Sequence, residues 1–176
     1  TLDRSSAASD VYKRQVEERP TGEIFAGAGT GTTGSSITAG IKENNYLGLG
    51  IKLDTNLTIT DDSIKGKFSM INPNYNNSGN ALSYNITNTK NDKPDSGFEN
   101  KIIGAGIGTK FEQYKNIYLT PTLNVTYDDL TVLGNASSSL KKQAGSYTDL
   151  SFGYSVQLDQ RDRVFMPTDG FITKQI

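Results

Sequence analysis

The chain has 176 residues, of which 34% are hydrophobic, and it carries a formal net charge of −1. A nearly neutral charge gives no electrostatic reason to expect a nucleic-acid partner. The sequence contains neither cysteine nor histidine, which excludes disulfides, Cys/His zinc sites and Ser-His-Asp triads within it. No run approaches the roughly 20 apolar residues that a membrane helix needs. We therefore expect no catalytic residue, no metal site and no cofactor in this chain.

The first segment, residues 1–15, differs from the rest of the chain in composition and pattern. Its stretch SSAASDVYKRQ resembles a translated sequencing adaptor, so we expect residues 1–15 to be a non-native flank. The alternative is a short native helix or a disordered leader. At the other end, FITKQI stops in what reads as the opening of a strand, and we expect the chain to be a piece of a longer protein.

From residue 22 onward, apolar and polar residues alternate with period two in segments separated by turn-forming residues. Alternate residues of a strand point to opposite faces, so each segment has one apolar and one polar face. The pattern predicts strands over residues 24–32, 36–43, 48–59, 64–70, 82–87, 103–111, 117–127 and 150–158, with a ninth beginning in 171–176.

The segment from Ile117 to Tyr127 has the most regular alternation. Transmembrane barrel strands need roughly 9–11 residues and alternate apolar and polar side chains in this way. We therefore predict an all-β fold, an antiparallel transmembrane β-barrel built as a meander, of which this chain supplies eight to nine strands. A soluble β-sandwich is the alternative, but its strands are commonly only about 5–6 residues long.

The connections between these strands fall into two alternating sets. One set lies near residues 33–35, 60–62, 88–97 and 130–146, and the other near 44–48, 72–79, 112–116 and 160–169. The longest predicted loop, 130–146, belongs to the first set. Because outer-membrane barrels have short periplasmic turns and longer outer loops, we expect the first set to be extracellular.

Two segments go beyond a generic barrel pattern. VEERPTG (16–22) directly precedes a glycine-rich first strand, and DQRD (159–162) is followed by PTDG (167–170). In this order and spacing they resemble the BamA family of outer-membrane β-barrel assembly factors, within the bacterial surface-antigen superfamily. The resemblance covers residues 16–176, and the alternative is a sister translocation or assembly branch of the superfamily.

The resemblance implies a sixteen-stranded barrel in the bacterial outer membrane, with residues 23–176 as its N-terminal half. Residues 16–22 would end the last periplasmic POTRA domain, and Pro20, Thr21 and Gly22 would form the junction with the barrel. The partners it implies are unfolded outer-membrane proteins, periplasmic assembly lipoproteins and membrane lipids. The function it implies is the assembly and insertion of β-barrel proteins into the outer membrane, without enzymatic activity.

The resemblance also implies a weak seam between the first and last strands of the barrel. Glycine within a strand weakens it, and an edge strand exposes backbone groups that can pair with another strand. We therefore expect the first strand to bind client strands as a backbone template. Its residues are Ile24, Phe25, Ala26, Gly27, Ala28, Gly29, Thr30, Gly31 and Thr32. The alternative is that its glycines only relieve crowding in the lumen.

A second candidate site is the turn after the eighth strand. It contains Asp159, Arg161, Asp162, Pro167, Thr168 and Gly170. Its charged residues would make an acid–base constellation, but we favour a structural role in which opposite charges pair and fix the turn. A passive porin-like channel is one alternative function, and it would not require the two family motifs. A barrel enzyme such as an outer-membrane lipase is another, and because this sequence has no histidine, its usual hydrolase base would have to lie outside it.

Overall fold

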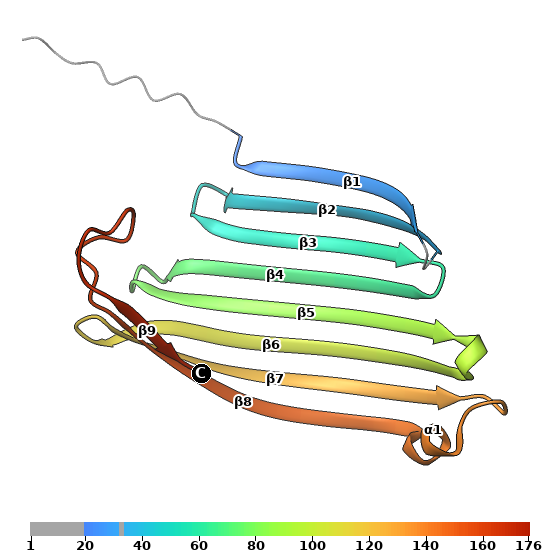
Figure 1. The fold of residues 1–176 in the computed structure, drawn as a ribbon. Helices are drawn as coiled ribbons and strands as arrows, with labels where there is room; N and C mark the ends of the chain where they lie inside the picture. The colour runs from blue at the N-terminus through green and yellow to red at the C-terminus, as the bar shows by residue number, and fades with distance from the viewer. Residues whose placement is uncertain (1–19, 32–33) are drawn as a thin grey trace, which may run out of the picture.

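The computed structural model describes residues 20–31 and 34–176. Nine strands form one antiparallel sheet in which each strand pairs with its neighbours in sequence (Figure 1). They are β1 (Gly22–Gly31), β2 (Gly34–Tyr46), β3 (Ile51–Thr60), β4 (Ser63–Tyr75), β5 (Asn80–Lys93), β6 (Phe98–Tyr114), β7 (Ile117–Val132), β8 (Gly145–Asp159) and β9 (Ile172–Gln175). A 3₁₀ turn, η1 (Pro94–Ser96), joins β5 to β6, and helix α1 (Ser138–Gln143) lies between β7 and β8. The predicted all-β meander is confirmed.

Several strand boundaries differ from the prediction. Residues 88–93, expected in a loop, continue β5, because their backbone pairs with β4 on one side and β6 on the other. Asn72 to Tyr75, expected to end the fourth strand, remains in β4 across a register shift. Gly48 and Gly50, expected inside the third strand, instead lie in the preceding turn with φ values of +71° and +68°.

The two longest connections lie at opposite ends of the strands. Residues 133–144 join β7 to β8, and residues 160–171 join β8 to β9. They are equally long, so loop length alone does not orient the sheet. The assignment of an extracellular and a periplasmic end therefore stays a prediction. Within the described part of the chain, no helix is long and apolar enough to cross a membrane.

The register of the sheet shifts steadily from strand to strand. Gly22, at the start of β1, belongs to a row of paired residues that reaches Phe152 in β8. Strand β8 ends at Asp159, seven residues beyond Phe152, so over the seven strand-to-strand steps the row has moved by one residue per step on average. With about 3.3 Å per residue and about 4.8 Å between strands, this stagger corresponds to a strand tilt of about 35°. Transmembrane barrels have tilts of about 35–45°.

One face of the sheet is apolar, and its side chains are exposed. On β8 alone, Leu150, Phe152 and Tyr154 are 73%, 70% and 64% exposed. The only buried hydrophobic residue among those the structure describes is Ala136. A β-sandwich would cover this face with a second sheet, whereas the strands of residues 20–31 and 34–176 form a single sheet. The face is therefore suited to contact lipid.

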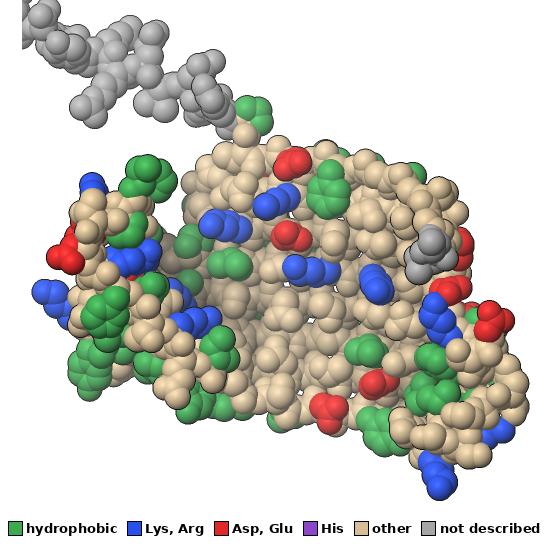
Figure 2. All heavy atoms as spheres, in the orientation of Figure 1, with side chains coloured by type: hydrophobic (Ala, Val, Ile, Leu, Met, Phe, Trp, Pro, Cys, Tyr) green, Lys and Arg blue, Asp and Glu red, His purple; other side chains and the backbone are tan. Residues whose placement is uncertain are grey.

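The other face is polar and crowded. A Cβ added to Gly106 of β6 would lie 2.2 Å from the Asn124 side-chain oxygen, and one added to Gly104 would lie 2.7 Å from Thr87 Oγ1. Such crowding is expected on the concave side of a curved sheet. Figure 2 shows this face, with charged side chains gathered over β1–β4. By register it carries Lys42, Lys52, Lys65 and Lys67 with Glu23 and Asp54 on β1–β4, and Asp128 and Asp149 on β7 and β8.

Candidate functional site

Strand β1 lies at one edge of the sheet. Within the described residues it pairs only with β2, and every residue from Gly22 to Gly31 is exposed. Ile24, Ala26, Ala28 and Thr30 share the apolar side, and Phe25, Gly27, Gly29 and Gly31 share the polar side. The last predicted template residue, Thr32, lies outside the described residues.

Three of the four glycines of β1 face open space. A Cβ added to Gly27 or Gly31 would meet no atom within 4 Å, and one added to Gly29 would meet only Ser36 Oγ at 3.7 Å, whereas one added to Gly22 would lie 2.5 Å from Glu43 Oε2. The glycines of β6 are tightly enclosed by contrast. Within the described residues, crowding therefore does not account for Gly27, Gly29 or Gly31, and this part of the strand is held to β2 by its backbone.

The predicted junction leads directly into β1. Pro20 and Thr21 are exposed, and Gly22 is the first residue of the strand. The Thr21 carbonyl oxygen accepts hydrogen bonds from the backbone and side-chain nitrogens of Asn44, at 3.2 and 3.3 Å. These bonds attach the residues preceding β1 to the end of β2.

The turn between β8 and β9 brings the predicted charged residues together. Arg161 donates two hydrogen bonds to the Asp159 carboxylate, from Nε at 2.7 Å and from Nη2 at 2.6 Å. Asp162 accepts from Thr168 N at 3.0 Å, Thr168 Oγ1 at 2.8 Å and Asp169 N at 3.2 Å. We call these three hydrogen bonds to Asp162 the Asp162 clamp. Pro167 lies within the segment that they close, and Gly170 follows that segment with a φ of +89°.

These contacts shift the pKa values of charged groups in the turn. The hydrogen bond from Thr168, with those from backbone amides, holds the pKa of Asp162 below its ordinary value. The bond to Asp159 raises the pKa of Arg161. A general acid that works near neutral pH needs a raised carboxyl pKa, so this geometry favours a structural role over acid–base chemistry. Among residues 20–31 and 34–176, no group of three or more acidic side chains could hold a metal ion.

The Asp162 clamp is expected to weaken in acid. Because folding lowers this pKa, the stabilisation is fully present above the unfolded value and is lost as the pH falls through the lower folded value. We expect the hydrogen-exchange protection factors of the Thr168 and Asp169 amides to fall over that range. Asp162→Asn should show weak protection at neutral pH with little further change in acid. Unchanged protection in the wild type throughout acidification would contradict the clamp.

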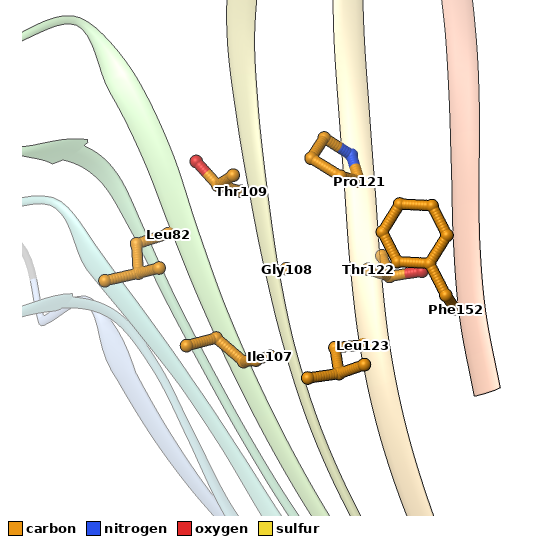
Figure 3. A pocket seen from close by; sticks show the side chains of 8 residues that line it. All are labelled: Leu82, Ile107, Gly108, Thr109, Pro121, Thr122, Leu123 and Phe152. Atoms are coloured by element: carbon orange, nitrogen blue, oxygen red, sulfur yellow. The ribbon is translucent and has the colours of Figure 1, made fainter. Parts of the chain in front are cut away.

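A shallow groove on the apolar face surrounds Pro121 of β7 (Figure 3). Pro121 lacks a backbone N–H, and the β6–β7 pairing is interrupted between Gly108/Thr122 and Phe111/Leu119. Pro121 still lies opposite Tyr154 of β8. The groove belongs to the lipid-facing surface and adds no polar binding site.

These features define the wall of a transmembrane β-barrel, since the sheet combines a barrel-like strand tilt with one apolar face and one polar face. Residues 45–176 match the model of the Omp85 superfamily domain, and the chain belongs to this superfamily. It is also similar to the crystal structure of BamA from Haemophilus ducreyi lacking POTRA domains 1–3, with a TM-score of 0.57 and 25% identity. The match covers 90% of this chain and 34% of that chain, so the present chain spans about a third of the length of the crystallised chain. The BamA-like resemblance is confirmed.

Sequence reasoning did not single out Gly40 of β2. A Cβ at this position would lie 2.4 Å from Cζ of Phe25, so the ring occupies the space above the glycine. One available signal was the interruption of the polar row Ser36, Thr38 and Lys42 by a glycine. The register that places Gly40 opposite Phe25 comes from the structure.

Proposed function

We propose that this protein assembles and inserts β-barrel proteins into the bacterial outer membrane, with β1 as a backbone template for client strands. The observation that carries the proposal is an exposed, glycine-rich edge strand in an Omp85-superfamily barrel wall. Lipid offers no partner for backbone N–H and C=O groups at membrane depth. An incoming strand that pairs with β1 would satisfy these groups on both chains. The proposed function involves no enzymatic step.

We further propose that residues 23–176 form the N-terminal half of a sixteen-stranded barrel. Residues 16–22 would end a POTRA domain and residues 1–15 would be a non-native flank, although residues 1–19 lie outside the described part of the chain. In this arrangement the turn at 160–171 faces the periplasm, and Asp159 at the end of β8 maintains it together with Arg161 and Asp162. Unfolded outer-membrane proteins, periplasmic assembly lipoproteins and membrane lipids are the proposed partners.

Cross-linking tests the template directly. Single cysteines replacing Ile24, Ala26 or Ala28 in the full-length protein are expected to form adducts with the terminal strand of an assembling client. The physical reason is that β1 pairs only with β2 within the described residues, whereas β6 pairs with neighbours on both sides. Cysteines at Ile103 and Ile107, on the apolar side of β6, are the matched controls and should give few adducts.

Adducts at the β6 positions but none along β1 would reject the template. Depletion of the protein distinguishes the passive channel, because an assembly factor is expected to leave unfolded outer-membrane proteins behind. Ion conductance by the full-length barrel with normal assembly on depletion would favour the channel.

A further inference from the structure

Phe25 is the one aromatic side chain on the polar side of β1, and it lies over a glycine of the neighbouring strand. Phe25 is directly opposite Gly40 in the β1–β2 register. A Cβ at Gly40 would lie 2.4 Å from Phe25 Cζ and 2.8 Å from Cε1. The ring is 38% exposed, whereas neighbouring Ile24 on the other side is 82% exposed. Gly40 therefore leaves space for the Phe25 ring that a residue with a side chain would occupy itself.

Apart from the hairpin connection to β2, the rest of the strand specifies its alignment only weakly. Glycine-rich strands are prone to register slips, and a slip of two residues leaves every side chain on its original face. In the two possible slips, Phe25 would lie opposite Thr38 or Lys42, whose side chains would compete with the ring for space. The observed alignment also places Glu23 opposite Lys42, and opposite charges in such a pair are stabilising. A slip would place Glu23 opposite Gly40 or Asn44 and would remove this pairing.

We propose that Phe25, whose ring lies over Gly40, sets the register of β1 on β2 and thereby the register in which a client strand pairs with β1. Phe25 is a positioning residue, because it acts through the alignment of the backbone. The alignment of β1 on β2 stands on the geometry alone. Its transmission to the client rests on the proposed template function.

Disulfide formation between engineered cysteines measures the register. The chain contains no cysteine of its own. Ala26 lies opposite Ala39, so a cysteine pair at these positions reports the observed register. Pairs at Ala26 with Ile37 and at Ala26 with Ile41 report slips of two residues in either direction. All four positions lie on the apolar side, and the measurement is made on the full-length protein folded in lipid bilayers.

Removing the Phe25 ring should allow β1 to slip relative to β2. In Phe25→Ala the ratio of slipped to native disulfide is expected to rise about fivefold, the effect of losing a strong cross-strand pair. Phe25→Leu should give an intermediate rise and provides a second test if the alanine variant folds poorly. Phe25→Tyr keeps the ring and should retain the wild-type ratio. Phe68→Ala removes a similarly exposed (37%) ring from the apolar side of β4 and should also leave the ratio unchanged.

The outcomes separate the register from the template. An unchanged ratio in both Phe25→Ala and Phe25→Leu overturns the role of Phe25, whether or not client adducts form. If β1 slips, adducts from a cysteine at Ala28 should move by two residues along the client strand. A slip without that movement overturns the transmission to the client. Native disulfides with no client adduct in the wild type would instead reject the proposed function and leave the register role intact.

Discussion

Gly170→Ala is expected to prevent the turn between β8 and β9 from closing. Gly170 has a φ of +89°, and a Cβ there would lie 2.1 Å from the Gln160 carbonyl oxygen and 2.7 Å from the Arg161 Cα. A strained backbone alone costs about 1–3 kcal/mol, and overlap with backbone atoms cannot be relieved by side-chain rotation. We expect a loss of at least about 3 kcal/mol in the free energy of unfolding, measured by urea titration of the full-length protein in bilayers.

Gly134→Ala is the matched control for this experiment. Gly134 lies in the connection between β7 and β8, and an added Cβ would meet no atom within 4 Å. Its unfolding midpoint should remain close to that of the wild type. If Gly170→Ala unfolded at the same urea concentration as Gly134→Ala, the described turn geometry would be wrong.

Gly106→Ala is expected to destabilise the barrel, whereas Gly27→Ala is not. An added Cβ at Gly106 would lie 2.2 Å from Asn124 Oδ1 and 2.4 Å from Asn85 Oδ1, so both asparagines must move. Overpacking of this kind typically costs about 1–3 kcal/mol. At Gly27 the space is open, and alanine is favoured over glycine within a strand by roughly 0.5–1 kcal/mol.

The same urea titration compares these two variants. Gly106→Ala should shift the unfolding midpoint downward, and Gly27→Ala should leave it unchanged or raise it. Equal losses in the two variants would contradict the contrast between the crowded β6 and the open β1. A stable Gly27→Ala variant also provides folded protein in which the template function can be measured separately from stability.

The sequence predicted some strands better than others for a physical reason. Between Ile117 and Tyr127, regular alternation defines the strand and both of its faces, and β7 begins at Ile117 as predicted. Residues 88–93 are polar on both faces, so the sequence pattern predicts a loop there. They are strand because β4 and β6 supply backbone partners, and such tertiary pairing outweighs local propensity.

In the candidate sites, too, some features could be predicted from the sequence and others could not. The charges of Asp159, Arg161 and Asp162 indicated a paired turn because they lie close together in sequence. The hydrogen bonds from Thr168 to Asp162 depend on the path of the chain between them, which includes Met166 at a φ of +49°. The contact between Phe25 and Gly40 depends on the register of a hairpin, which alternation alone leaves open by two residues.

The charged residues on the concave face have a consequence for any polypeptide within the lumen. On β2–β4 this face carries Lys42, Lys52, Lys65 and Lys67 with Asp54, whereas on β6–β9 Asp128 and Asp149 are accompanied by Lys110 and Lys174. The excess of positive charge on this face therefore lies over β2–β4, although positive and negative charges nearly balance in the whole chain. We expect an anionic side chain within the lumen to be attracted toward β2–β4.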